Sequence, residues 1–287
     1  MKVLVPVLTV LSVIVVLWYG AAIWLNAQWT YDQAARAGAE VSFSELLADT
    51  LTQDRPVLPA PHQVAAGLWD GFFAQKVTSK RSLVYHGWIT LSATLLGFAI
   101  GSGAGIVLAV GIVHNRAMDL SVMPWAIASQ TIPILAIAPM VIVVLASVGV
   151  TGILPKAVIS AYLSFFPVVV GMAKGFRSPR PMQLDQLRTY NATRAQTFWK
   201  LRFPASLPYL FASLKVSVAA SLVGAIVGEL PAGGAGGLGA RLLSGSYYGQ
   251  TIQIWSALFT AAILAAGLVM IIGAIEKATL RRMGMGG

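Results

Sequence analysis

Long apolar runs separated by short polar segments dominate this sequence. Six of the runs approach the roughly 20 residues that a helix needs to cross the hydrocarbon core of a membrane. They lie at residues 3–25, 88–113, 120–147, 154–173, 205–230 and 252–275. The pattern therefore predicts an all-α polytopic membrane protein with six transmembrane helices.

The third run is the least regular of the six. Pro124, Pro133 and Pro139 interrupt it, and a proline inside a helix removes a backbone hydrogen bond and clashes with the preceding turn. Such breaks are tolerated at membrane depth where the freed backbone is buried in protein or lines a cavity. We therefore expect this span to be kinked or broken.

The basic residues suggest how the spans are oriented. The first run, about 23 residues long, exceeds the roughly 7–15 apolar residues of a secretory signal, so residues 1–25 are predicted to remain as the first span. Placing both termini in the cytoplasm puts most short basic segments inside, as the positive-inside rule requires. The polar segment 26–85, with amphipathic helices near 43–49 and 62–74, then lies outside, and residues 86–287 form a core with five spans.

Composition agrees with this membrane class and removes other chemistries. The chain is 57% hydrophobic and only 10% charged, whereas soluble domains are about 25% charged. Its net charge of +10 lies beside apolar runs, as in membrane topology, so no nucleic acid partner is expected. There is no cysteine, no metal-binding motif and no phosphate-binding GxxxxGK[ST] motif. We expect no metal or nucleotide on this chain and no enzymatic activity.

One polar segment lies between the fourth and fifth runs. It reads DQLRTYNATRAQTFWKLRFPASLP from Asp185 to Pro208, with apolar residues at helical spacing and basic residues on the other face. Asn191 falls where two short helices would meet, and asparagine is the best choice after glycine for a backbone with positive φ. The pattern predicts an amphipathic helix pair, residues 181–204, which we call the docking segment.

The docking segment resembles the cytoplasmic loop of type I ATP-binding-cassette (ABC) importer permeases. That loop carries Glu-Ala-Ala, then Gly after three residues, then Ile-x-Leu-Pro after nine more. At the same spacing this chain has Asp185-Gln186-Leu187, Asn191, Leu201 and Phe203-Pro204. Asp replaces Glu, the two alanines are lost, and Asn replaces Gly.

Three further stretches are similar to permeases of the nitrate, sulfonate and taurine group. Leu58-Pro59-Ala60-Pro61-His62-Gln63-Val64 resembles the motif before their core, and Gln130-Thr131-Ile132-Pro133 resembles their broken helix. Val227-Gly228-Glu229, with Gly237-Leu238-Gly239, resembles their last outer loop. The resemblance covers about residues 57–282.

The resemblance implies an importer of a small polar solute in a bacterial inner membrane, working by alternating access. Two permease copies would pair with two ATPase subunits that hold ATP and Mg, and a periplasmic binding protein would deliver a solute of the nitrate, sulfonate, taurine or pyrimidine-like class. The residues expected to dock the ATPase are Asp185, Leu187, Arg188, Asn191, Ala192, Arg194, Phe198, Leu201 and Pro204.

A secondary transporter driven by an ion gradient is the alternative. It would need paired ionisable residues at mid-membrane, and only Lys215 and Glu229 lie well inside a predicted span. Fourteen residues apart, they share a helix face within about 40° but are separated by roughly 21 Å along the axis, so they cannot pair directly. Two interpretations stay open. Either both residues line the pathway or a subunit interface, or Lys215 reaches toward the membrane surface and Glu229 caps a loop.

The other candidates for the translocation pathway lie at the broken third span and opposite it. Broken helices expose backbone polar groups to solutes, which favours Ser129, Gln130 and Thr131, with Tyr162 on the facing span. Small residues at a spacing of four allow close approach of membrane helices. The glycines expected to pack helices together in this way are Gly97, Gly101, Gly105, Gly224 and Gly228.

Overall fold

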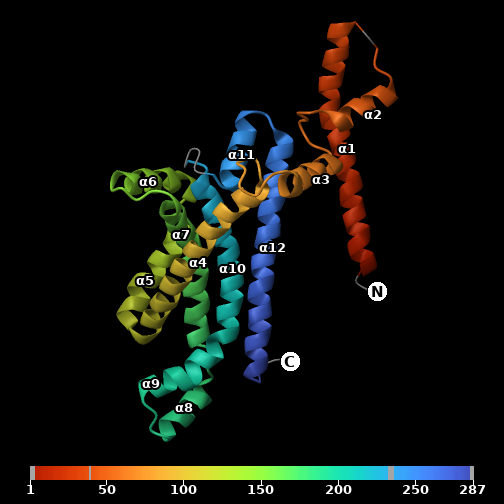
Figure 1. Ribbon diagram of the computed structural model, residues 1–287. Coiled ribbons are helices and arrows are strands. Elements are labelled where there is room, and N and C mark those ends of the chain that lie inside the picture. Colours follow the sequence, from red (N-terminus) through yellow and green to blue (C-terminus); the bar gives the residue numbers. More distant parts are fainter. Residues whose placement is uncertain (1–3, 39, 232–235, 285–287) are drawn as a thin grey trace. The chain divides into compact units, whose positions relative to one another are not determined.

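The computed structural model describes residues 4–38, 40–231 and 236–284, and the described residues form helices and no strands (Figure 1). The helices are α1 (Leu4–Ala37), α2 (Phe43–Thr52), α3 (Pro61–Trp69), η1 (Asp70–Ala74), α4 (Leu83–His114), α5 (Arg116–Ser129), α6 (Ile134–Ser147), α7 (Ile153–Phe176), α8 (Pro181–Thr189), α9 (Arg194–Thr197), η2 (Phe198–Arg202), α10 (Phe203–Glu229), α11 (Leu238–Tyr247) and α12 (Thr251–Arg282).

Five helical stretches are long and apolar enough to cross a membrane. They are Leu4–Ala37, Leu83–His114, Ile153–Phe176, Arg194–Glu229 and Thr251–Arg282. The pair α5 and α6 passes the same test together, but it is bent by 100°. Counted as one broken span, this pair brings the total to six among the described residues, which confirms the predicted fold class.

The break in the third span is residues 130–133, and of the three prolines only Pro133 lies in it. Pro124 and Pro139 are accommodated inside α5 and α6, while Pro133 precedes the first residue of α6 with an extended backbone, ψ 110°. A proline at a helix start sacrifices no intrahelical hydrogen bond. The sequence correctly predicted a break, and the structure identifies which proline makes it.

The chain divides into two compact units, of which the first contains Met1–His86 and Arg241–Thr260. Here α1 continues to Ala37, well past the predicted end of the first span, and α2 packs against it. Trp18 of α1 stacks on Phe259 and donates a hydrogen bond to the Pro59 carbonyl oxygen at 3.0 Å. The buried Asn26 side chain accepts from the Val57 amide and donates to the Thr50 carbonyl oxygen, which fixes the loop that leads to α3.

The second unit contains Gly87–Ala240 and Ala261–Gly287. Its centre is the long packing surface between α7 and α10, and α8 and α9 lie together at one end of these two helices (Figure 1). A buried cluster around Val168, Met172 and Phe176 joins α7 to Ala109 and Ile112 of α4.

Buried serines tie the helices of the second unit together. Ser217 of α10 donates to the Ser164 carbonyl oxygen at 2.6 Å, and Ser221 donates to the Thr94 carbonyl oxygen at 2.8 Å. Hydrogen bonds between helices are a usual means of holding a membrane bundle in register. These bonds hold α10 against α7 and α4 in the middle of the unit.

Candidate functional site

The docking segment has the predicted bend. Asn191 has φ 51° and is the one non-glycine residue with positive φ among the described residues. Its amide closes the end of α8 by donating to the Arg188 carbonyl oxygen at 2.9 Å. Thr193 then starts α9, accepting from the Gln196 amide at 3.2 Å while the Gln196 side chain accepts from the Thr193 amide at 2.8 Å.

An aromatic anchor holds the segment against the core. The Phe198 ring lies 5.2 Å from the rings of both His114 and Phe176, measured between centroids. Arg202 donates to the Phe176 carbonyl oxygen at 3.2 Å. Phe198 begins a π-helical turn that continues without interruption into α10. Phe198 therefore faces the core of its own chain and not the open side of the segment, where the sequence had grouped it with docking residues.

The open face of the segment carries large exposed side chains. Met182, Tyr190 and Trp199 are 83%, 75% and 63% exposed. Asp185 and Arg188 form an exposed ion pair at 2.9 Å. Of the other residues predicted to dock, Arg194 is exposed, whereas Leu187, Ala192, Leu201 and Pro204 are half-buried. Leu187 and Ala192 close the turn, since the Ala192 amide donates to the Leu187 carbonyl oxygen at 3.0 Å.

A recess of about 530 Å³ lies beside this face. Its charged lining residues are Arg188, Arg194 and Arg202, next to His114, and no acidic side chain lines it. Clustered positive charge raises the local concentration of negatively charged groups. The segment therefore presents large exposed side chains and a basic recess.

The broken third span presents its free end to Tyr162. The Tyr162 hydroxyl donates to the carbonyl oxygen of Ser129, the last residue of α5. The hydroxyls of Ser129 and Thr131 donate back to the Ala126 and Ala128 carbonyl oxygens at 2.7 and 2.8 Å. These two hydroxyls bond to their own backbone, whereas the Gln130 side chain is exposed at the break.

Glu229 lies inside the second unit at the end of α10, with 1% of its surface exposed. The Thr90 hydroxyl donates to its two carboxylate oxygens at 2.9 and 3.0 Å, and the Gly239 amide donates to Oε2 at 2.8 Å. Lys156, 3% exposed, donates to the Gly236 carbonyl oxygen at 3.0 Å. Lys156 and Glu229 thus hydrogen-bond to the two ends of residues 236–239. This arrangement favours the interpretation that Glu229 caps a loop over the interpretation that it lines a pathway.

Lys215 is paired with Glu276 of α12. The two side chains are 34% and 19% exposed. Sequence reasoning placed Lys215 without this partner, because Glu276 falls one residue beyond the predicted sixth run, whereas α12 continues to Arg282. Lys156, which the sequence did not single out, lies in the first turn of α7. As expected, Lys215 and Glu229 do not meet.

The predicted glycine faces lie where helices touch most closely. A side-chain carbon on Gly97 or Gly101 would lie 2.7 or 2.6 Å from the carbonyl oxygen of Ala157 or Ala161 on α7. A Cβ on Gly105 would lie 2.8 Å from the Phe165 carbonyl oxygen. On α10, Cβ atoms at Gly224 and Gly228 would lie 2.7 and 3.1 Å from the Cα atoms of Ser160 and Lys156. All five glycines therefore allow backbone approach to α7.

A search of the described residues for three or more His, Cys, Asp or Glu side chains able to hold one metal ion finds no such group. The pathway candidates do not form one site either. Ser129 and Tyr162 are brought together, whereas Glu229 and Lys215 have separate partners.

The sequence of this chain matches a known protein family. Residues 101–284 match the model of the binding-protein-dependent transport system inner membrane component. The riboflavin transport system permease protein RibX of Chloroflexus aurantiacus is 30% identical over 78% of this chain and 80% of its own length. The chain belongs to this family of ABC transporter permeases.

Other relatives have different named solutes. The formylaminopyrimidine transport permease protein ThiX of Halalkalibacterium halodurans is 30% identical over 60% of this chain and 65% of its own length. The putative aliphatic sulfonates transport permease protein SsuC of Bacillus subtilis is 24% identical over 68% of this chain and 69% of its own length. These matches confirm the resemblance read from the motifs.

The fold also matches a solved structure. A chain of the MetNI methionine ABC transporter, in inward-facing conformations, aligns with 70% of this chain and 95% of its own length. The TM-score is 0.53 and the sequence identity 23%. This likeness shows the fold, and the family match identifies the chain as a permease subunit of an ABC transporter. The named relatives are transport permeases.

Proposed function

We propose that two copies of this chain form the membrane pathway of an importer, with two ATPase subunits beneath them and a periplasmic binding protein above. ATP and Mg are held by the ATPase subunits. Both termini, the docking segment and the end of α7 face the cytoplasm. The observation that carries this proposal is the docking segment: a bent, exposed helix pair that continues directly into a spanning helix.

The docking segment transmits movement because it is joined to the core at several points. Met182, Tyr190 and the basic recess beside Arg188 and Arg194 contact the ATPase. Phe198 and Arg202 pass the displacement to α7 through Phe176. Closure of the ATPase pair then shifts α7 and α10 as one body and alternates access between the two membrane faces.

The solute passes beside the break between α5 and α6. Gln130 meets it, Ser129 and Thr131 shape the passage, and Tyr162 holds the free end of α5 in place. Lys215 and Glu229 hold neighbouring helices and a loop beside the passage through Glu276 and Thr90. We assign the solute to the small polar class that includes sulfonates, nitrate and pyrimidine-like precursors, and the binding protein selects among them.

Photocrosslinking tests the docking assignment. The natural chain has no cysteine, so Tyr190→Cys labelled with benzophenone-maleimide carries a single probe. Tyr247→Cys is the matched control, since these two tyrosines are 75% and 79% exposed. In membranes that contain the neighbouring ATPase, the probe at position 190 is expected to crosslink to the ATPase and the probe at 247 is not. Equal crosslinking of both, or of neither, would refute the assignment.

A further inference from the structure

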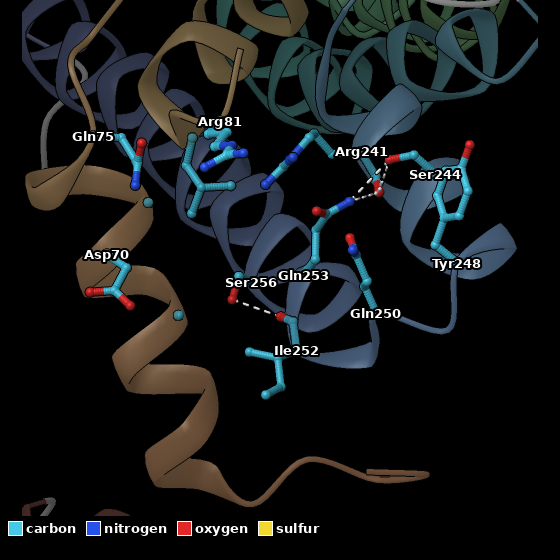
Figure 2. A pocket seen from close by; sticks show the side chains of 13 residues that line it. Asp70, Gln75, Arg81, Arg241, Ser244, Tyr248, Gln250, Ile252, Gln253 and Ser256 are labelled. Carbon is cyan, nitrogen blue, oxygen red and sulfur yellow. Dashed lines mark hydrogen bonds between the residues drawn. The ribbon is translucent and has the colours of Figure 1, made fainter. Parts of the chain in front are cut away.

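A polar pocket of about 580 Å³ lies within the first unit, apart from the docking segment and the broken span. Its walls come from α3 and η1, the loop that follows them, α11 and the first turns of α12 (Figure 2). This volume is in the range of small-molecule sites, about 300–1,000 Å³.

Close packing builds the walls. A side-chain carbon on Gly67 would lie 2.6 Å from Ser256 Oγ and 2.9 Å from an Ile252 methyl carbon, so α3 lies directly against α12. A carbon on Gly71 would lie 2.5 Å from the Leu83 side chain. The pocket is therefore framed by tightly packed helices and is not a gap beside a loose loop.

Two arginines point toward one another across this pocket, Arg81 from the loop and Arg241 from α11 (Figure 2). Arg241 Nε is buried and has no hydrogen-bond partner among the described residues. The Arg241 carbonyl oxygen, in contrast, accepts from Gln253 and Ser244 at 3.0 and 3.1 Å. Burial, and then the nearby Arg81 charge, lower the pKa of Arg241.

The pocket contains little negative charge to offset these cations. Asp70 is the one acidic side chain that lines it, is exposed, and makes no ion pair with either arginine in the described chain. Buried polar groups in native proteins nearly always have a partner, and an orphan often marks a missing ion or solvent molecule. Each guanidinium group presents a planar fork of N–H donors, and this fork matches two oxygens of a carboxylate, sulfonate or phosphate.

We propose that this pocket binds the oxyanion group of a small molecule, held by Arg81 and by the Nε and Nη atoms of Arg241. Gln75, Gln250 and Tyr248 also line the pocket and offer neutral hydrogen-bonding groups. The site is independent of the proposed transport cycle, because neither the docking segment nor the broken span contributes to it. The same chemistry is present in a free sulfonate or carboxylate and in the phosphate of an anionic lipid.

Arginine footprinting tests this site on the full chain in phosphatidylcholine nanodiscs. Phenylglyoxal labels accessible guanidinium groups, and peptide mass spectrometry reports each arginine separately. Sulfate, compared with chloride at equal ionic strength, is expected to slow labelling of the exposed Arg81 several-fold in a saturable manner. The exposed Arg36 serves as the internal control and should label at one rate throughout.

Substitutions make the test specific. Arg241→Gln should abolish the protection of Arg81 by sulfate, whereas Arg36→Gln should leave it intact. If Arg241→Gln fails to fold, Arg81→Gln provides the reciprocal test: sulfate should no longer protect Arg241 from labelling. Protection in phosphatidylglycerol nanodiscs without sulfate would support the site with a lipid phosphate as the source. Unchanged labelling under both conditions would overturn the proposal.

Discussion

Two glycines on nearly opposite faces of α4 provide a sharp test of how the second unit is packed. Gly101 and Gly103 lie two residues apart in the same helix. A Cβ at Gly101 would lie 2.6 Å from the Ala161 carbonyl oxygen and nearer still to Ser164 Oγ, whereas a Cβ at Gly103 would have no atom within 4 Å. The two alanine substitutions therefore differ in packing but not in their local effect on the helix.

The expected magnitudes follow from two opposing terms. Replacing a glycine inside a helix by alanine stabilises the helix by about 0.5–1 kcal/mol. A carbon–oxygen contact normally needs about 3.3 Å, so Gly101→Ala must move α4 and α7 apart by roughly 0.7 Å, and overpacking of this kind costs about 1–3 kcal/mol. Gly103→Ala should thus stabilise the protein slightly, and Gly101→Ala should destabilise it by about 1–2 kcal/mol.

Thermal unfolding in one detergent, followed by size-exclusion chromatography of the heated samples, measures this difference. The midpoint of Gly101→Ala should fall below that of the natural chain, and the midpoint of Gly103→Ala should equal or exceed it. If Gly101→Ala were as stable as Gly103→Ala, the close approach of α4 and α7 would be refuted.

Substitutions in three further places test the remaining contacts. Glu229→Gln replaces a charged acceptor of hydrogen bonds from Thr90 and Gly239, so it should lower the free energy of unfolding by about 2 kcal/mol. Glu40→Gln, at an exposed position, is the control. Equal unfolding midpoints for the two variants would contradict the role of Glu229 in holding residues 236–239. Asn191→Gly should preserve the docking segment. Asn191→Ala should destabilise the bend by about 1–2 kcal/mol, because alanine disfavours φ 51°, and should speed amide hydrogen exchange in the docking segment. Identical exchange in the two variants would contradict the bend. Lys215→Met should lower the unfolding midpoint more than Lys215→Met combined with Glu276→Leu, because the double change leaves no unpaired ion; an additive loss would show that the pair contributes nothing.

The sequence predicted the features that depend on local chemistry. Runs of apolar residues defined the spans because each must match the thickness of the membrane. The bend at Asn191 was predictable because few side chains tolerate positive φ, and the glycine faces because a spacing of four aligns residues on one side of a helix.

Contacts between distant parts of the chain were beyond the sequence. Nothing local to Phe198 reveals that it packs on His114 and Phe176. The hydrogen bond between Thr90 and Glu229 joins residues 139 positions apart. Lys156 is buried near this carboxylate, although its position at the edge of an apolar run is equally typical of a residue exposed in a loop.

The central claim is that this chain couples an ATPase to the import of a solute. The most direct measurement purifies the chain with the ATPase and the binding protein of its transport system, and follows ATP hydrolysis in nanodiscs with the binding protein empty or loaded. The account predicts a stable complex whose hydrolysis rises with the loaded binding protein and falls to the basal rate when Tyr190 and Met182 are both replaced by aspartate. Failure of the ATPase to associate, together with uptake that follows an ion gradient, would contradict the account.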